Sequence, residues 1–391
     1  MKTTKLLSIL TFILFLLTSC NTNGQSNEEI DNDSTEVIKD EISFLFLGDI
    51  MQHDLQTQSA YVPEKDIYDF SSQFKYVKPI FDSTDVVVGN LEVTFGGAPY
   101  KGYPRFSSPN DLAWEIKESG IDYLVTANNH VYDRGKKGFE RTMKLLDSIG
   151  IKRTGTFIDR EDMIKNHPMI IEKNNFKIAL FNYSYGLNGN ILENPSIVND
   201  IDKVKIKSDL KVASESDYDA VIVTFHWGVE YQHQPNNEQI ETANFCFENG
   251  ADIVIGSHPH VIQRMEHKTY KTDSGKEKDV LVAYSLGNFV SNYGTWRYCD
   301  GGTMIRFKLQ KDENGELSIQ DPNYHLIWVY REPKGNKLMN YYVLPIADFE
   351  DKNDLKAEDN KQMKIFIDDS RKLYNAENIN VPEVKKMINN E

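Results

Sequence analysis

The stretch Ala251-Asp-Ile-Val-Ile-Gly-Ser-His258-Pro259-His260 carries the pattern that decides the fold. Its apolar, β-branched run predicts a buried strand, which stops at a glycine shortly before two histidines. In open α/β sheets, binding sites lie beyond the carboxyl ends of the strands, which is where this strand would deliver its imidazoles. Taken alone, the two histidines fit either an ordinary turn or a pair of ligands.

Four other apolar runs end in the same way, in side chains that can bind a metal ion. The runs and the residues that follow them are 41–47 with Asp49 and His53, 85–89 with Asn90 and Glu92, 121–126 with Asn129 and His130, and 218–225 with His226. Helical patterns closed by glycine lie between several of these runs, which predicts a β-α-β order and an α/β fold with parallel strands. After His260 the pattern changes to short strands and hairpins, so the C-terminal part should be rich in antiparallel strands. The sequence therefore predicts that one edge of one sheet gathers all of these donors.

The donor types indicate the class of metal. Imidazole, carboxylate and amide groups without a thiolate suit Mn, Fe, Zn or Co in five- or six-coordinate sites, rather than structural zinc. Two such ions about 3.5–4 Å apart, bridged by a carboxylate, would hold a phosphoryl group and activate a nucleophile.

Composition limits the partners of the chain. Its 391 residues are 40% hydrophobic and 26% charged, which is typical of a globular protein. The formal net charge is -15, and this acidic balance argues against binding to nucleic acid. An anionic substrate would therefore have to be attracted locally, by metal ions or by a few placed arginines and lysines.

The N-terminal residues have the pattern of an export signal. A short basic segment, an apolar run too short to cross a membrane comfortably and small residues before Cys20 predict a signal peptide over residues 1–19. The end of this segment resembles the bacterial lipoprotein box, in which the cysteine receives a lipid. An ordinary secretory signal with an incidental cysteine is the alternative. Residues 20–40 are polar and predict a flexible tether.

The remaining chain predicts one domain over residues 41–347 and a charged, peripheral C-terminal extension over residues 348–391. Two cysteines remain in this part, Cys246 and Cys299. Whether they pair cannot be deduced from their spacing.

Six motifs together resemble the bacterial capsule-synthesis CapA family, whose best-known members act in poly-γ-glutamate capsule assembly. The motifs run in order through residues 43–305 and are Gly48-Asp49-Ile-Met, Asn90-Leu-Glu92, Ala127-Asn-Asn-His-Val-Tyr-Asp133-Arg-Gly135, His226-Trp-Gly-Val-Glu230, Gly256-Ser-His-Pro-His260 and Tyr284-Ser-Leu-Gly-Asn-Phe289. That family is similar in fold to calcineurin-like metallophosphoesterases. The resemblance implies a four-layer α/β/β/α sandwich with a parallel-rich first sheet, an antiparallel-rich C-terminal part and two divalent metal ions, with Mn, Fe or Zn expected.

The phosphoesterase pattern also implies a role for each matching residue. Asp49 and His260 would bind the first metal, Glu92 would bridge, and the second metal would be bound by Asn129, His226 and His258. His130 would protonate the leaving oxygen, with Asp133 holding an imidazole or the backbone beside it.

The sequence departs from that pattern at the first metal. The phosphoesterases have Asp-x-His at the first strand, whereas Ile50-Met51 follows Asp49 here, so the first metal lacks a histidine unless His53 replaces it. An exposed loop position is the alternative for His53. Glu92 stands in place of a bridging aspartate and is longer by one methylene.

Several further residues are candidates for contacts around the site. Glu230 would either orient His226 or be a surface charge, and Asn288 would either line the site or cap a turn. The candidates for substrate binding are Arg105, Arg134 and Asn288, with Lys101 on the same loop as Arg105.

These observations lead to two hypotheses. The first is a metal-dependent, phosphoesterase-like protein, lipid-anchored through Cys20 in the cell envelope, acting on a phosphate ester or an acidic polymer in capsule or envelope polymer synthesis. The second is a non-catalytic protein that binds or tethers an anionic polymer, or supports a capsule synthase complex.

Overall fold

The computed structural model describes residues 40–293, 296–352 and 354–385. The predicted signal peptide, Cys20 and nearly all of the predicted tether lie outside these residues. Within the described residues, every helix is too short or too polar to cross a membrane.

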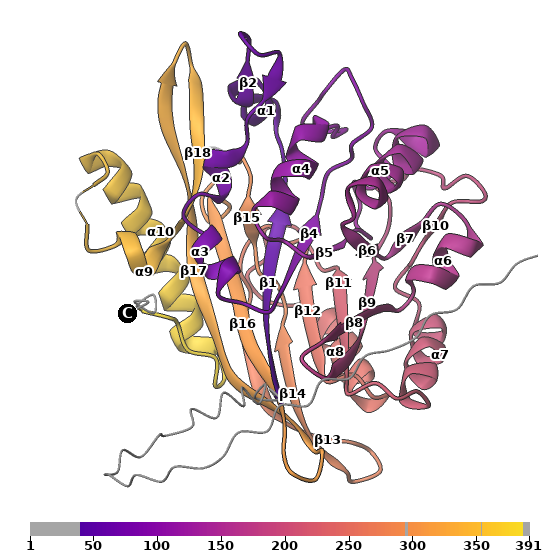
Figure 1. The fold of residues 1–391 in the computed structure, drawn as a ribbon. Coiled ribbons are helices and arrows are strands. Elements are labelled where there is room, and N and C mark those ends of the chain that lie inside the picture. The colour runs from indigo at the N-terminus through magenta and orange to yellow at the C-terminus, as the bar shows by residue number, and fades with distance from the viewer. Residues whose placement is uncertain (1–39, 294–295, 353, 386–391) are drawn as a thin grey trace, which may run out of the picture. The chain divides into compact units, whose positions relative to one another are not determined.

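Two β-sheets face each other at the centre of the domain (Figure 1). The first sheet has the order β18-β17-β16-β1-β4-β5-β6, and β15 also pairs with β1. Its strands are β1 (Glu41–Ile50), β4 (Val86–Leu91), β5 (Tyr123–Val125), β6 (Lys152–Thr154), β15 (Asn288–Val290), β16 (Gly301–Lys311), β17 (Leu317–Gly335) and β18 (Leu338–Pro345). The order of the second sheet is β13-β14-β12-β11-β9-β8. It consists of β8 (Met169–Lys173), β9 (Phe176–Ser184), β11 (Ala220–His226), β12 (Ile253–Ser257), β13 (Met265–Lys271) and β14 (Glu277–Ala283).

The predicted α/β fold is confirmed, but the expectation of a single site-bearing sheet was wrong. Parallel pairing joins β1, β4, β5 and β6 in the first sheet. It also joins β9, β11, β12 and β14 in the second sheet. Each sheet thus has a parallel core with antiparallel strands at its margin, and the runs ending in ligands are divided between the two sheets. The strands are buried on both faces, so their apolar patterns alone do not show which sheet each belongs to.

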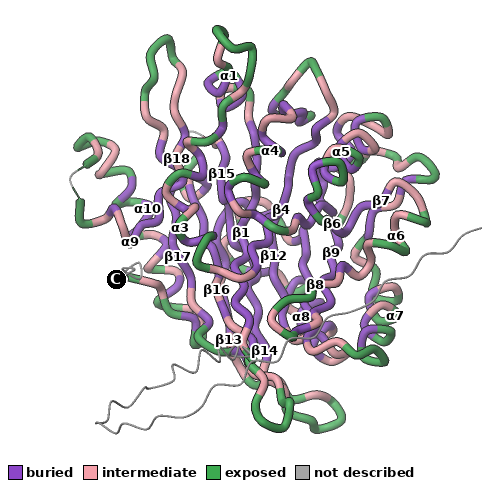
Figure 2. The backbone as a smooth tube through the Cα atoms, in the orientation of Figure 1, coloured by how far each residue is buried: buried purple, intermediate pink, exposed green. Residues whose placement is uncertain are grey.

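The core between the sheets follows the alternation of side chains along the strands. In β1, Phe44 and Phe46 point into the inter-sheet core, whereas Leu45 and Leu47 belong to the core on the outer face. Helices α2 (Ser71–Phe74), α3 (Lys78–Asp82), α4 (Asn110–Glu118) and α5 (Gly135–Ile149) contribute to that outer core of the first sheet. Helices α7 (Lys203–Ser214) and α8 (Asn237–Glu248) cover the second sheet. The result is the expected α/β/β/α sandwich, with buried strands and exposed outer helix surfaces (Figure 2).

The remaining helices and short strands complete the domain. They are α1 (Asp54–Ala60), β2 (Tyr61–Val62), β3 (Ile67–Tyr68), β7 (Thr156–Phe157), α6 (Arg160–Asn166), β10 (Ile197–Val198), α9 (Ile346–Phe349) and α10 (Ala357–Glu377).

The C-terminal segment belongs to the domain and is not the peripheral extension that its charge suggested. Helix α10 places Phe366, Ile367 and Tyr374 in the inter-sheet core. Arg371 on the same helix forms ion pairs with Glu350 and Glu383. The high charge of this segment lies on the exposed side of an amphipathic helix, which explains why composition was misleading.

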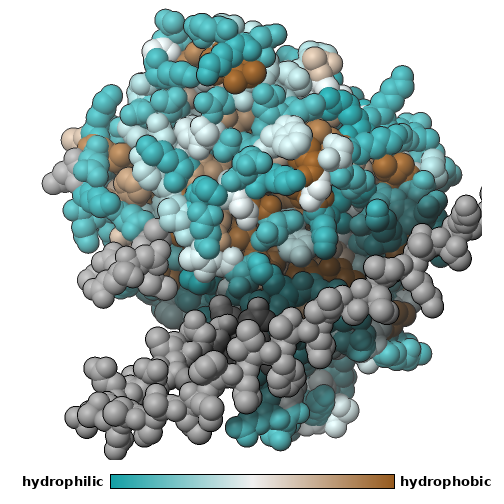
Figure 3. Space-filling view, in the orientation of Figure 1, coloured by the Kyte–Doolittle hydropathy of each residue, from teal (hydrophilic) through white to brown (hydrophobic). Residues whose placement is uncertain are grey.

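The two cysteines of the described domain are both buried and free. The possibility of a Cys246–Cys299 disulfide is therefore not realised. The surface seen in Figure 3 is mostly hydrophilic, in keeping with the acidic composition.

Two glycines allow the site-bearing strands to approach their neighbours closely. A Cβ on Gly48 would lie 2.1 Å from the carbonyl oxygen of Gly287, and a Cβ on Gly256 would lie 2.0 Å from the carbonyl oxygen of Tyr284. Both contacts are with backbone atoms, which cannot turn away as a side chain can. Each glycine lies one or two residues before a predicted ligand, Asp49 or His258, so backbone packing determines where these ligands are placed.

We expect Gly256→Ala to lower the free energy of unfolding by about 3 kcal/mol, because the added methyl group must displace the β12 backbone. Gly186→Ala is a matched control, since its Cβ would meet nothing within 4 Å. It should change stability by less than about 0.5 kcal/mol. Urea unfolding of both variants measures the difference, and equal stabilities would contradict this account of Gly256.

A buried polar cluster outside the site should make stability depend on pH. Asp209 on α7 accepts hydrogen bonds from His167 Nε2 (3.0 Å), Lys205 Nζ (2.7 Å) and the Tyr183 hydroxyl (2.8 Å). Burial alone would raise the pKa of Asp209, but the hydrogen bonds from His167 and Lys205 outweigh it and lower this pKa to about 2.

Because the folded-state pKa of Asp209 lies below its ordinary value, its stabilising contribution is present above about pH 4 and is lost as the pH falls toward 2. Asp209→Asn should therefore be less stable than wild type by about 1–2 kcal/mol at pH 7, with a gap that narrows between pH 4 and pH 2. Thermal unfolding across this range tests the prediction, and a gap independent of pH would refute it.

Candidate metal centre

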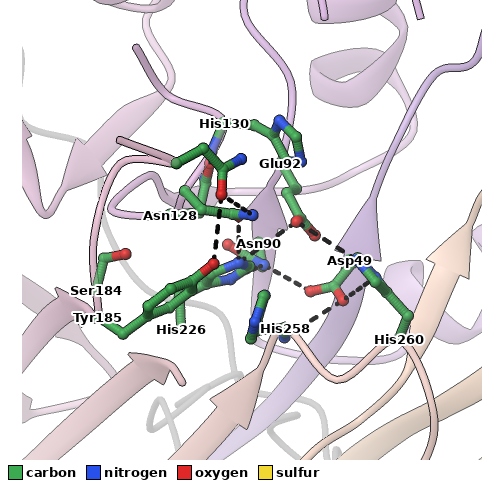
Figure 4. Close-up of polar contacts among 12 residues, drawn as sticks. Asp49, Asn90, Glu92, Asn128, His130, Ser184, Tyr185, His226, His258 and His260 are labelled. Carbon is green, nitrogen blue, oxygen red and sulfur yellow. Dashed lines mark hydrogen bonds and ion pairs between the residues drawn. The ribbon is translucent and has the colours of Figure 1, made fainter. Parts of the chain in front are cut away.

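Strand ends from both sheets meet at one place, where their polar side chains point toward one another (Figure 4). The first sheet supplies Asp49 from β1, Asn90 from β4, Glu92 just after β4, and Asn129 from the loop after β5. The second sheet supplies His226 at the end of β11 and His258 and His260 after β12. The structure thus brings together all six predicted metal ligands, although they come from two sheets.

Asp49 and His260 form one side of this cluster. The Asp49 Oδ2 atom lies 3.1 Å from His260 Nδ1, and Asp49 Oδ1 accepts a hydrogen bond of 2.7 Å from Asn90 Nδ2. Asn288 Oδ1 lies 3.1 Å from His260 Nδ1, and Asn288 Nδ2 donates to the His260 carbonyl oxygen. His260 is therefore fixed from both sides, with its Nε2 atom directed toward Glu92.

Glu92 is the central residue of the cluster and is fully buried. Its Oε1 atom lies 3.4 Å from His226 Nε2 and 3.8 Å from His260 Nε2. Within the described part of the chain, neither oxygen of Glu92 receives a hydrogen bond. A buried carboxylate without donors is costly, so this position fits a bound cation.

The other side of the cluster consists of neutral nitrogen and amide groups. Asn129 Oδ1 lies 2.8 Å from His226 Nε2. Among the described residues, His258 Nδ1 and Asn90 Oδ1 are buried without a hydrogen-bond partner. Three groups of side chains hold ligand atoms within 4.8 Å of one another, namely Glu92 with His226 and His258, Asp49 with Glu92 and His260, and Glu230 with His258 and His260.

The acid–base states of the cluster suit cation binding. Burial lowers the pKa of His226 to about 3 and also lowers the pKa of His258, so both imidazoles are neutral, which is the form that binds metals. Burial, together with the nearby charge of Asp49, raises the pKa of Glu92 well above its usual range. The protein thus places a carboxylate where only a compensating positive charge keeps it ionised at neutral pH.

His260 differs from the other two histidines. Burial alone would lower its pKa, but the charges of Glu92 and Asp49 outweigh burial and raise this pKa to about 9. For Asp49, burial would raise the pKa, but the hydrogen bond and charge of His260 lower it instead. This ion pair compensates part of the carboxylate charge and leaves the oxygens of Glu92 without a donor.

The turn that carries the two histidines is strained. His258 has a φ of 102° and His260 a φ of 58°, a region that side chains other than glycine rarely adopt. Such conformations cost of order 1–3 kcal/mol each and persist where the surrounding structure holds them. The Pro259 carbonyl oxygen, which accepts a hydrogen bond of 2.8 Å from Tyr231 N–H, helps to hold this turn.

His130 and Asp133 form a pair at the edge of the cluster. His130 Nδ1 lies 2.8 Å from Asp133 Oδ2, which also accepts the backbone N–H of Phe106 at 2.7 Å. Because Asp133 fixes Nδ1 as the donor, Nε2 is the nitrogen left for exchange with a ligand. Both residues line the neighbouring cavity.

The other candidate residues have different surroundings in the structure. His53 belongs to none of the three groups of ligand atoms; its Nδ1 atom accepts the backbone N–H of Asn292, and its ring packs against Phe106 and Tyr293. Asn288 is fully buried behind His260, so its contacts position this histidine and do not line the cavity. Arg105 lines the cavity.

Two basic candidates lie outside the cavity lining. Arg134 packs against Gly96 and donates to the Pro99 carbonyl oxygen, which directs it away from the cluster. Lys101 is exposed and pairs through its backbone with Ser107. Of the three arginine and lysine candidates, Arg105 alone is placed to meet a ligand in this cavity.

Sequence reasoning missed the aromatic residues around the cluster. The ring of Tyr185 lies 4.5 Å from that of His258 and stacks on His226 at 6.3 Å. Tyr231, Tyr293 and Trp296 form a wall on the opposite side, beside His260. Tyr185 directly follows β9, so its place after a strand was the available signal, whereas the wall depends on loops from distant parts of the chain.

A cavity of about 570 Å³ opens beside the cluster. Its polar lining includes Arg105, His130, Asp133 and Glu230, and its apolar lining is largely aromatic. This volume lies in the range of small-molecule sites, which is about 300–1,000 Å³.

The fold and the cluster define a four-layer α/β protein with a candidate metal centre. A family model described as "Bacterial capsule synthesis protein PGA_cap" matches residues 43–293. The chain therefore belongs to this family of bacterial capsule synthesis proteins, as its six motifs indicated.

Two curated relatives share part of this sequence. The capsule biosynthesis protein CapA of Bacillus anthracis is 27% identical over 263 residues, which cover 63% of this chain and 60% of that protein. The PGA biosynthesis protein CapA of Bacillus subtilis (strain 168) is 28% identical over 296 residues, which cover 73% of this chain and 72% of that protein. The chain thus spans less than two thirds of the length of the first of these relatives.

Solved structures with a similar arrangement have low sequence identity. The NAD nucleotidase NadN of Haemophilus influenzae is 15% identical, with a TM-score of 0.47 over 89% of this chain and 64% of that chain. The calcineurin-like phosphoesterase YfkN of Bacillus subtilis is also 15% identical, with a TM-score of 0.45 over 73% of this chain and 90% of that chain.

Because both oxygens of Glu92 lack a hydrogen-bond partner, we expect added metal to stabilise the protein. Mn²⁺ at 100 times its dissociation constant should add about 2.7 kcal/mol to the free energy of unfolding of the wild type. Glu92→Gln should lose most of this gain, because the amide carries no charge and its N–H₂ group repels a cation. Glu140→Gln on the surface of α5 is the control and should keep the gain. Thermal unfolding with Mn²⁺ or with a chelator measures the effect, and an unchanged gain in Glu92→Gln would refute the assignment.

Proposed function

We propose that this chain is a metal-dependent, phosphoesterase-like protein of capsule or cell-envelope polymer synthesis. The observation that supports it most directly is Glu92, a fully buried carboxylate with two unpaired oxygens between His226 and His260. Family membership supports the capsule setting, and the names of the CapA relatives from Bacillus suggest poly-γ-glutamate as one polymer in that setting.

The residues present fit two divalent cations. Asp49 and His260 would hold the first, and Asn129, His226 and His258 would hold the second, with Glu92 shared by both. The mixture of oxygen and nitrogen donors suits Mn, Fe or Zn. When bound, such ions would polarise a phosphoryl oxygen and lower the pKa of a coordinated water.

The protein's own groups supply the remaining functions. His130, held through Nδ1 by Asp133, presents Nε2 to the cavity and in its imidazolium form would donate a proton to a leaving oxygen. Arg105 would contact an anionic group of the substrate from the cavity wall. Asn288 would keep His260 in its orientation.

A second candidate function is non-catalytic binding or tethering of an anionic polymer within a capsule synthase complex. One observation favours it: His53 does not join Asp49, so the first metal group consists of Asp49, Glu92 and His260. A site with one imidazole is weaker toward transition metals than a site with two.

We further propose that the mature protein is anchored to a bacterial membrane through a lipid on Cys20 and works in the cell envelope. This rests on the pattern of residues 1–20. Metabolic labelling with a radioactive fatty acid should mark the wild type and not Cys20→Ser.

The enzyme hypothesis predicts loss of both metal and turnover when a ligand is removed. His260→Ala and Asn129→Ala should each lower kcat/KM for the generic diester bis-p-nitrophenyl phosphate at least about 10²-fold. Metal content should fall from two equivalents toward one. His267→Ala on β13, whose Nε2 lies 2.8 Å from Asp279, is a control outside the cluster and should keep both values.

Metal analysis together with turnover separates the two candidate functions. Two equivalents with diester hydrolysis support the enzyme, whereas one equivalent or none without turnover supports the binding protein. Full activity in His260→Ala would refute the catalytic assignment of the cluster.

A further inference from the structure

An exposed aromatic wall stands beside the candidate metal centre. The ring of Tyr231 lies 4.9 Å from that of Trp296 and 6.1 Å from that of Tyr293. Trp296 is 56% exposed although it lines the cavity. Tryptophan is usually well buried, and an exposed tryptophan in a cavity next to two tyrosines is typical of a surface that receives a ligand.

Two members of the wall, Tyr231 and Tyr293, are held against the cluster by contacts within the protein. Tyr231 donates its backbone N–H to the Pro259 carbonyl oxygen between the two histidines of the cluster. The Tyr293 ring lies 5.0 Å from that of His260, and the neighbouring Asn292 donates its N–H to His53 Nδ1. A rigid aromatic surface loses little entropy on binding, so it adds affinity efficiently.

Three asparagines contribute neutral polar groups to the lining of the cavity. Asn188, Asn190 and Asn292 present amides, which both donate and accept hydrogen bonds. Asn188 is also tied to the cluster, since its Oδ1 accepts a hydrogen bond of 3.2 Å from Asn129 Nδ2. Such groups match hydroxyl-bearing ligands.

The charges of the lining disfavour a polyanion. The cavity has one arginine, Arg105, and two carboxylates, Asp133 and Glu230. Asp133 is paired with His130, but Glu230 adds negative charge beside Tyr231. A run of carboxylates that extended along this cavity would meet like charge at Glu230, whereas a neutral ring would meet no such penalty.

We propose that the cavity binds a sugar ring, with the phosphate ester attached to that sugar directed toward the metal centre. The nonpolar C–H face of the ring would pack on Trp296 and Tyr231, and its hydroxyls would bond to the asparagine amides and Glu230. This inference rests on the proposed function and specifies its substrate class as a sugar phosphate ester. A volume of about 570 Å³ is large enough for more than a phosphate group alone.

Calorimetric titration of the Mn²⁺-loaded, full-length chain tests the proposal. The ligands are α-D-glucose 1-phosphate, N-acetyl-α-D-glucosamine 1-phosphate, glycerol 3-phosphate, adenosine monophosphate, poly-γ-glutamate and inorganic phosphate. At least one hexose phosphate should bind at least tenfold more tightly than glycerol 3-phosphate, which carries hydroxyls without a ring. The hexose phosphate should also bind more tightly than the nucleotide or the polymer.

Substitutions at the wall identify the cause of this preference. Trp296→Ala should reduce the tenfold preference to less than twofold, whereas Trp296→Phe should keep most of it. Trp114→Ala is the matched control, because Trp114 is 49% exposed on α4 and lies outside the cavity lining. It should leave the preference unchanged. Thermal unfolding of each variant verifies that it is folded.

The outcomes distinguish this proposal from the proposed function. Three results would overturn the sugar site. The first is a wild-type preference below twofold for both hexose phosphates over glycerol 3-phosphate. The others are a preference that survives in folded Trp296→Ala and tighter binding of the nucleotide or of poly-γ-glutamate. Failure of inorganic phosphate to bind would instead count against the metal-dependent phosphoesterase. In that case an uncharged disaccharide tests the sugar site separately. Quenching of tryptophan fluorescence in wild type but not in Trp296→Ala would still support the sugar site. No quenching in wild type would overturn it.

Discussion

Burial of the Glu92 carboxylate is the constraint on which the rest of this site depends. Water is excluded from its oxygens, and the neutral imidazole of His226 and the imidazole of His260, whose pKa is raised to about 9, lie near it without donating a hydrogen bond. An isolated charge in such a place would favour unfolding or protonation. The arrangement suits a protein that binds a cation there, and strands of both sheets hold this carboxyl group in place.

The sheets hold it through backbone contacts. Gly48 and Gly256 bring β1 and β12 against the backbone around Tyr284 and Gly287, so that Asp49 and the His258–His260 turn arrive at a fixed separation. The same turn has two histidines with positive φ. The backbone strain of this turn costs free energy, and the tight packing of the preceding strands holds the turn in place. The favourable free energy of the two buried cores has to exceed the cost of this strain.

Much of the cluster could be predicted because the sequence pattern that marks each ligand is local. An apolar run followed by a ligand residue identifies Asp49, Glu92, Asn129, His226, His258 and His260, and the structure brings all six together. The division of their strands between two sheets could not be predicted, since strands buried on both faces have no polar side to orient them. Helix α10 was misjudged because an amphipathic helix of high average charge still buries residues such as Phe366. The aromatic wall was missed for a different reason: Tyr231, Tyr293 and Trp296 are neighbours only after distant loops have met.

The direction of β1 has a consequence for how the molecule faces its surroundings. The strand enters the domain at Glu41 and reaches the cluster at Asp49. At about 3.3 Å per residue, this separates the point of entry from the site by roughly 26 Å. The described chain thus enters the domain at the end of β1 that is remote from the cluster. From that point of entry to the site the distance is set by a rigid strand, so a long polymer could reach the cluster without passing the residue at which the chain enters the domain.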